Sequence, residues 1–192
     1  MGKQASNPSE AAAGDPFAGV PDSVREAQDR YIQTWGQMGS AWGISRTMAE
    51  VHALLYITGL SLCTDDVMAR LQISRGNASM SLRALQDWGI IKRTHKPGDR
   101  KEYFFAESDV WAMFRTIASE RKKREIDPVV QALFEIRDLT QKGRDEATKG
   151  HNERLDSMLQ FMQTVEALSG MFFAPDGGGL QEAVSRLSDG AP

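Results

Sequence analysis

The chain has 192 residues, of which 41% are hydrophobic and 26% charged, and its formal net charge is −3. This composition is typical of a globular protein, and the slightly acidic balance gives no overall sign of a nucleic-acid partner. The single cysteine, Cys63, excludes an internal disulfide and suits a reducing compartment. No apolar run approaches the roughly 20 residues that span a bilayer, and the N-terminus shows no secretory signal. We therefore expect a cytoplasmic protein without membrane association.

Residues 1–22 are rich in Ala, Gly, Pro and Ser and show no apolar period. We expect a disordered N-terminal tail, with Phe17 and Val20 as its only candidate anchors. A helix is predicted over 23–45, because an apolar stripe recurs there at helical spacing: Tyr31, Trp35, Met38 and Trp42. The next helix, over 46–58, is predicted to bury a second set of apolar residues: Met48, Val51, Leu54, Leu55 and Ile57.

Two short helices joined by only a few residues come next. Thr64 is predicted to cap the first, whose inner face is formed by Val67, Met68 and Leu71. Ser74 is predicted to cap the second, and Gly89 to end it just after Trp88.

The second of these helices has an unusual composition. One side is apolar and suits a core: Ala78, Leu82 and Leu85. The other side carries small or hydrogen-bonding residues together with two arginines: Arg75, Gly76, Asn77, Ser79, Met80 and Arg83. Ser, Asn and Gly are mediocre helix formers, whereas a helix that only faces water would use Glu, Lys and Gln. The pattern predicts close approach to a partner.

After Gly89 the pattern changes to two extended runs, IIKRTHKPG and RKEYFFAES, which meet at Pro97-Gly98-Asp99. Pro fixes one φ and Gly supplies another that other residues avoid, so a β-hairpin is predicted. We expect Asp99 to hold the turn by accepting hydrogen bonds from its N–H groups or by pairing with a neighbouring Arg. Two short helices followed by a hairpin form a winged helix-turn-helix, and we assign residues 46–107 to such a DNA-binding domain.

Charge supports this interpretation. Residues 74–104 carry seven basic and three acidic side chains, a balance of +4, so the rest of the chain sums to −7. The positive field is therefore concentrated on one segment. In the helix, Arg75 and Asn77 suit guanine and adenine edges respectively, and Arg100 and Lys101 lie where a wing reaches a minor groove or its phosphates.

The remaining chain is predicted to be helical. Ser108 is expected to cap a helix over 109–126 that ends before Pro128, and further helices are predicted at 128–142 and about 151–172. The last has a heptad-like stripe: Leu155, Met158, Leu159, Met162, Val165 and Leu168. We assign 23–45 and 108–173 to dimerisation, since their apolar stripes exceed what a small winged domain covers. Residues 174–192 are expected to be a flexible tail. The predicted fold is mainly α with a small β-hairpin wing.

The stretch QISRGNASMSLRALQDWGIIKRTHKPGDRKEYFFAESDVW resembles the GbsR-type branch of the MarR superfamily of transcriptional regulators. The resemblance covers roughly residues 25–170 and is densest from 64 to 128. It implies a homodimer that binds a pseudo-palindromic double-stranded DNA operator, most often as a repressor relieved by a ligand. The implied DNA-binding residues are Ser74, Arg75, Gly76, Asn77, Ser79, Met80 and Arg83 on the helix, and His95, Lys96, Arg100 and Lys101 on the wing. Met80 either contacts a thymine methyl or packs against the preceding helix.

Some members with this pattern sense choline-like ligands. An aromatic cage for a choline- or betaine-like effector would use Tyr31, Trp35, Trp42 and Trp111 through cation–π attraction, although aromatics at this spacing are more often core or dimer interface. No spacing of His, Cys, Asp or Glu indicates a metal site, no cofactor is implied, and no catalytic motif indicates an enzyme. The alternative is a winged-helix architectural or protein-interaction module without sequence-specific reading of DNA.

Overall fold

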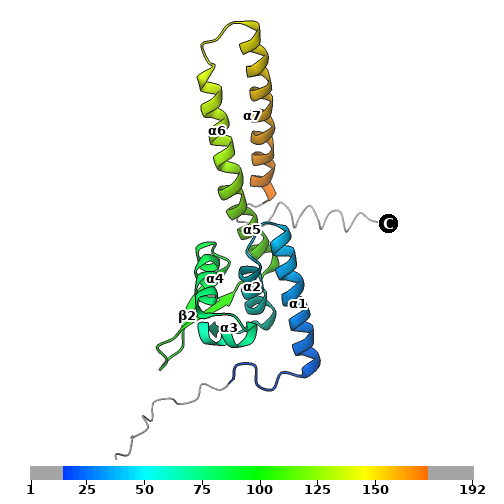
Figure 1. Ribbon diagram of the computed structural model, residues 1–192, viewed down its shortest axis with the longest axis vertical. Helices are drawn as coiled ribbons and strands as arrows, with labels where there is room; N and C mark the ends of the chain where they lie inside the picture. Colours follow the sequence, from blue (N-terminus) through cyan, green and yellow to red (C-terminus); the bar gives the residue numbers. More distant parts are fainter. Residues whose placement is uncertain (1–14, 173–192) are drawn as a thin grey trace, which may run out of the picture. The chain divides into compact units, whose positions relative to one another are not determined.

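The computed structural model describes residues 15–172 of the chain (Figure 1). The predicted C-terminal tail and the first 14 residues lie outside the described residues. The chain divides between Ser108 and Asp109 into two compact units. In the part of the chain that is described, no helix is both long and apolar enough to cross a membrane.

The first unit contains a helical layer and a small antiparallel sheet with the strand order β1-β3-β2. Its elements in chain order are α1 (Asp22–Ala41), α2 (Arg46–Thr58), β1 (Leu62–Cys63), α3 (Thr64–Leu71), α4 (Arg75–Asp87), β2 (Ile91–His95) and β3 (Glu102–Ala106). The predicted hairpin is confirmed, with Ile91 opposite Ala106 and His95 opposite Glu102. Strand β1 was not predicted, because its two residues are too few to show alternation.

The core of this unit lies where α2 meets α3, α4 and the sheet. Its largest fully buried side chains are Val51, Leu54, Leu55, Leu62, Val67, Leu82, Leu85 and Ile91. The predicted buried face of α2 is confirmed except at Ile57, which is 37% exposed. His52, one turn before Leu55 and Tyr56, is buried instead although it is polar.

Helix α1 packs closely on α2 through small residues, and Tyr31 and Trp35 of its aromatic stripe lie against Tyr56 and His52 of α2. Its buried positions are Ile32, Gly36 and Gly39. A Cβ atom built on Gly39 would lie 2.5 Å from the Cβ of Ala49, so a side chain at this position would force the two helices apart. Of the predicted stripe, Tyr31, Trp35 and Met38 are half-buried and Trp42 is 53% exposed, so the first unit leaves part of the stripe uncovered.

The segment before α1 is anchored by Phe17, one of the two residues that the sequence offered for this role. Phe17 is buried, and the guanidinium of Arg70 lies 5.7 Å from the centre of its ring. Arg25 donates a hydrogen bond from Nη2 to the Phe17 carbonyl oxygen at 3.2 Å. The predicted disordered tail is therefore wrong for residues 15–21, which are held against the first unit.

Three helix starts show how local hydrogen bonds set the boundaries. Ser74 caps α4 as predicted, with its Oγ accepting from the Asn77 amide at 3.2 Å. Thr64 is the first residue of α3 rather than its cap: the cap is Cys63, whose amide donates to the Asp66 carboxylate at 2.8 Å. The predicted cap at Ser108 is also wrong, because Asp109 accepts from two amides of the first turn of α5.

The second unit consists of α5 (Val110–Arg121), a π-helical turn η1 (Lys122–Ile126), α6 (Asp127–Leu139) and α7 (Glu146–Phe172). The predicted helix end before Pro128 is replaced by η1, in which the Asp127 amide donates to the Lys122 carbonyl. Pro128 then falls in the first turn of α6, where its missing N–H is not needed.

Helices α6 and α7 form an antiparallel hairpin (Figure 1). Arg137 donates two hydrogen bonds to Asp156, from Nε at 2.6 Å and from Nη2 at 3.2 Å, and Lys122 Nζ lies 2.8 Å from Glu166 Oε1. Of the stripe predicted on α7, Leu159 is buried whereas Met158, Val165 and Leu168 are exposed. The hairpin thus covers only part of its own apolar surface.

Candidate nucleic-acid interface

Helices α3 and α4 are joined by the short turn 72–74 and followed directly by the β2–β3 hairpin. Gln72 adopts a left-handed conformation with φ 53°, which reverses the chain sharply after α3. Gly89, with φ 72°, ends α4 and turns the chain into β2. Helices α3 and α4 and the β2–β3 hairpin therefore form a winged helix-turn-helix, as the sequence predicts.

Helix α4 has the two faces expected from its sequence. Ala78, Leu82 and Leu85 are buried, and Ser81, which the sequence did not single out, is buried beside them. Of the α4 residues assigned to DNA, Ser79 is half-buried. The others are exposed: Ser74, Arg75, Gly76, Asn77, Met80 and Arg83. One continuous polar surface at the start of α4 therefore faces away from the core.

The exposure of Met80 distinguishes between the two roles considered for it, a contact with a thymine methyl and packing against the preceding helix. Its side chain is 72% exposed. A residue that braced α4 against the preceding helix would be largely covered, so this alternative is wrong. The apolar side chain stands on the same surface as Arg75, Asn77 and Arg83.

Gly76 has no packing reason to be a glycine. A Cβ atom built there meets only Ser74 Oγ, at 3.9 Å, which is ordinary contact. Its backbone is helical, and Gly in a helix costs roughly 0.5–1 kcal/mol relative to Ala. Packing within the folded chain therefore does not require a glycine at this position.

The wing is held by Asp99 as the sequence predicts. Its carboxylate accepts from the Lys101 amide at 2.9 Å and from the Tyr103 hydroxyl at 2.6 Å. The hydrogen bond to Asp99 raises the pKa of Tyr103 to about 12, and the same bond lowers the pKa of Asp99. Lys96 Nζ lies 4.0 Å above the centre of the Tyr103 ring. The turn is therefore fixed although it is exposed.

Asp65 is a residue that sequence reasoning missed as part of this surface. It lies in the first turn of α3, where an acidic residue has a sufficient explanation in the helix dipole. In the structure its Oδ1 lies 2.5 Å from Arg75 Nη2 and its Oδ2 lies 3.2 Å from Lys101 Nζ. Hydrogen bonds from Lys101 and then Arg75 lower the pKa of Asp65. The pairings join positions too distant in the sequence for any spacing rule to find.

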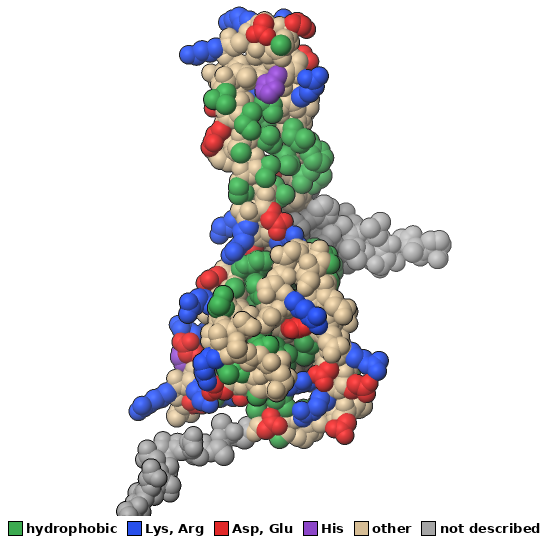
Figure 2. Space-filling model, viewed as in Figure 1, with side chains coloured by type: hydrophobic (Ala, Val, Ile, Leu, Met, Phe, Trp, Pro, Cys, Tyr) green, Lys and Arg blue, Asp and Glu red, His purple; other side chains and the backbone are tan. Residues whose placement is uncertain are grey.

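Carboxylates accompany several of the seven basic residues of 74–104. Besides Arg75 and Lys101, Lys92 pairs with Glu107 at 3.2 Å and Arg93 with Glu102 at 2.6 Å. Within the described part of the chain, Arg83, Lys96 and Arg100 form no ion pair with a carboxylate. Figure 2 shows basic and acidic side chains next to one another on this unit. The positive charge is distributed over α4 and the wing but partly neutralised from within.

Of the four aromatic residues assigned to an effector, Tyr31 and Trp35 lie together. Tyr31 and Trp35 stack with their ring centres 5.7 Å apart, and Tyr56 stacks on Tyr31 at 6.2 Å. His52 completes this cluster between α1 and α2, beside Trp35. Burial lowers the pKa of His52 to about 4, and its Nε2 has no hydrogen-bond partner among the described residues. Trp42 follows the end of α1 and Trp111 belongs to the second unit.

Comparison with known proteins agrees with the winged helix-turn-helix class. The chain is similar to the HTH-type transcriptional repressor GbsR of Bacillus subtilis, with 27% identity over 113 residues, which cover 59% of this chain and 62% of that protein. It is also similar to the putative HTH-type transcriptional regulator YvaV of the same organism, with 22% identity over 96 residues, 50% of this chain and 54% of that protein. The resemblance to GbsR-type regulators is thereby confirmed, although the chain spans less than two thirds of the length of these relatives.

The fold has a counterpart among solved structures. A crystal structure described as a transcriptional regulator matches 85% of this chain and 99% of its own, with a TM-score of 0.51 and 20% identity. This match supports the architecture. No protein-family model matches the chain.

Proposed function

We propose that the protein is a sequence-specific double-stranded-DNA-binding transcriptional regulator that acts as a homodimer in the cytoplasm. The observation that carries the proposal is the surface of α4: Arg75, Gly76, Asn77 and Met80 are exposed on a helix whose opposite side is fully buried. In a winged helix-turn-helix the second helix enters the major groove and the first crosses the backbone. Catalysis is no part of this proposal.

The chemistry of the two elements suits two different tasks. On α4, Arg75 offers the fork that matches guanine and Asn77 the amide that matches adenine. The free N–H groups at the helix start, beside Ser74, suit a phosphate. On the wing, Arg100 is exposed and Lys96 and His95 stand at the turn, where they reach the backbone or the minor groove.

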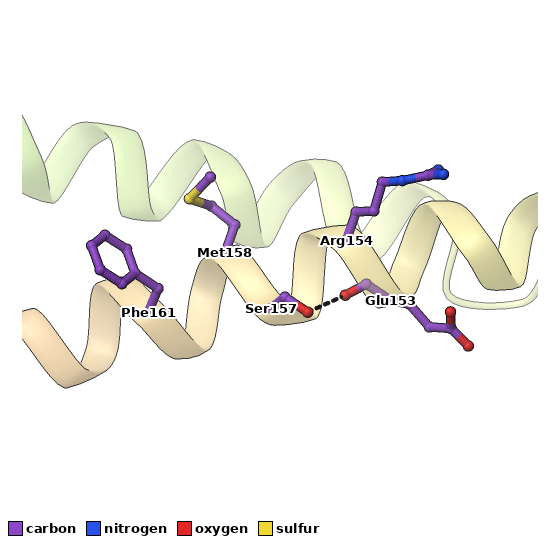
Figure 3. A pocket seen from close by; sticks show the side chains of 5 residues that line it. All are labelled: Glu153, Arg154, Ser157, Met158 and Phe161. Atoms are coloured by element: carbon purple, nitrogen blue, oxygen red, sulfur yellow. Dashed lines mark hydrogen bonds between the residues drawn. The ribbon is translucent and has the colours of Figure 1, made fainter.

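A second copy of the chain accounts for the apolar surface of the α6–α7 hairpin. The exposed large hydrophobic side chains are Val129, Phe134, Ile136 and Leu139 on α6, and Met158, Phe161, Val165 and Leu168 on α7. Figure 2 shows hydrophobic side chains running along this hairpin. A groove of about 460 Å³ lies beside Arg154, Met158 and Phe161 (Figure 3). Contiguous apolar surface of this kind is typical of protein interfaces.

Repression and its relief by a ligand are the finer part of the proposal. The relative GbsR is named a repressor. Of the aromatic residues assigned to a choline- or betaine-like effector, Tyr31 and Trp35 stack on one another with their ring centres 5.7 Å apart. A cage would require these rings to open. Titration with choline and with betaine, followed by tryptophan fluorescence in the natural protein and in Trp35→Phe, tests this part separately.

Binding to the DNA upstream of the protein's own gene tests the main proposal. A mobility-shift titration is made over a series of salt concentrations with excess random-sequence competitor. The proposal predicts a complex that survives the competitor. Equal affinity for all sequences would favour the alternative of an architectural module, and no binding at moderate salt would contradict both.

A further inference from the structure

The carboxylate of Asp65 is placed between the two elements assigned to DNA. It reaches Arg75 at the start of α4 with one oxygen and Lys101 of the wing with the other, at 2.5 Å and 3.2 Å. Asp65 itself belongs to α3. The Asp65 side chain therefore links α3, α4 and the wing.

The pairing leaves both cations able to act on DNA. Arg75 has five N–H donors and uses one nitrogen, Nη2, on Asp65, while the Lys101 ammonium has three donors. The side chain of Arg75 is 66% exposed and that of Lys101 48% exposed, so their remaining donors face solvent. A contact with Asp65 and a contact with DNA are compatible.

We infer that Asp65 is a specificity-determining positioning residue: it fixes the direction of the Arg75 guanidinium for a base edge and withholds one positive charge from non-specific DNA. The inference rests on the proposed function. Fixing a rotamer-rich side chain before binding lowers the entropy cost of a bidentate base contact. Keeping a negative charge beside two cations weakens the sequence-independent attraction to phosphates.

The neighbouring carboxylate, not Asp65, forms the cap of α3. Asp66 forms the capping hydrogen bond to the Cys63 amide at 2.8 Å. Asp65 forms no contact of this kind, and its side chain is 44% exposed. Asp66→Asn is therefore the matched structural control. Asp87→Asn, at the exposed end of α4, is the matched charge control.

The test uses two duplexes and the full-length protein. One duplex of about 30 base pairs is selected from a random pool by the natural protein, and the other is a shuffled version of the same sequence. For Asp65→Asn we expect affinity changes of opposite sign: about tenfold weaker on the selected duplex, and about fivefold tighter per protomer on the shuffled duplex at 0.15 M salt. The salt slope on the shuffled duplex should steepen by about 0.9 per protomer.

Any result other than affinity changes of opposite sign on the two duplexes overturns the inference. If Asp65→Asn weakens binding to both duplexes, as expected for Asp66→Asn, the role is structural. If it strengthens binding to both, as expected in smaller measure for Asp87→Asn, the role is only electrostatic. Unchanged affinities leave Asp65 with no role in recognition.

A double-mutant cycle identifies the partner through which Asp65 acts. In an Arg75→Ala background, Asp65→Asn should no longer weaken binding to the selected duplex. A persistent tenfold loss would show that Arg75 is not the residue positioned. Failure of the proposed function looks different: the natural protein would then enrich no sequence from the pool, or bind neither duplex.

Discussion

Gly76 and Gly39 are both helical glycines, yet only one of them is explained by packing. Gly39 is needed because a Cβ atom would lie 2.5 Å from Ala49, whereas the space at Gly76 is open. Ser74 and Asn77 flank Gly76 with small polar side chains. Packing within the chain therefore explains Gly39 but not Gly76.

Replacing each glycine by alanine separates the two reasons. Gly39→Ala should lower the free energy of unfolding by about 1–3 kcal/mol, since the backbones of α1 and α2 cannot approach as closely. Gly76→Ala should leave stability unchanged or raise it by up to about 1 kcal/mol, but weaken DNA binding. Denaturant unfolding and mobility shift measure the two effects. Destabilisation by Gly76→Ala would contradict the account.

Arg75, Asn77 and Arg100 are predicted to differ in what they recognise. Arg75→Ala and Asn77→Ala should each cost about 1–3 kcal/mol of discrimination between the selected and the shuffled duplex. Arg100→Ala should weaken both alike and make the salt slope shallower by about 1. Affinities measured at several salt concentrations check this. A selective effect at Arg100 and none at Asn77 would show that the groove assignments are wrong.

At the scale of elements, the sequence predicts what depends on neighbours along the chain. Ser74 as a cap, Gly89 as a helix end and the hairpin around Gly98 all follow from local chemistry, and all three are found. The apolar periodicity of α1 predicts the helix, but it does not reveal the close backbone approach at Gly36 and Gly39. Asp65 was missed because its partners come from other elements.

The buried His52 should make the α1–α2 contact sensitive to acid. Its pKa is lowered from 6.5 to about 4 by burial, so the unfolded chain takes up a proton more readily than the folded one. This contribution to stability is complete above pH 6.5 and is lost as the pH falls towards 4, by about 3 kcal/mol in total. Urea unfolding at pH 7, 5.5 and 4.5 measures it.

A ring-conserving substitution is the control. His52→Phe keeps an aromatic ring beside Trp35 and Tyr56 but cannot be protonated. The fall in stability between pH 6.5 and pH 4.5 should shrink markedly in this variant. An equal fall in both proteins would show that His52 does not carry the effect.

At the scale of the whole molecule, the excess of positive charge and the exposed apolar surface lie on different parts of the chain. The segment 74–104 carries a balance of +4 within a chain of net charge −3. The α6–α7 hairpin exposes its large apolar side chains, among them Leu139 at 84% and Phe161 at 60%. The proposed DNA binding and the proposed self-association therefore use different parts of the chain and can be tested separately.

A charge placed on the hairpin should disrupt the dimer. Phe161→Glu should weaken dimerisation by at least about tenfold, since an unpaired carboxylate would be buried in the interface. Sedimentation over a range of protein concentrations measures this, with Gln160→Glu, exposed on the same helix, as the control. A dimer that is unaffected by Phe161→Glu would place the interface elsewhere.

Parallel selections from a random DNA pool test whether α4 reads base edges. The natural protein should enrich a pseudo-palindrome whose half-sites lie about one helical turn apart. Asn77→Ala should enrich the same spacing but lose its preference for adenine at one position in each half-site. A pool that does not converge, or an identical consensus from both proteins, would contradict this role of α4.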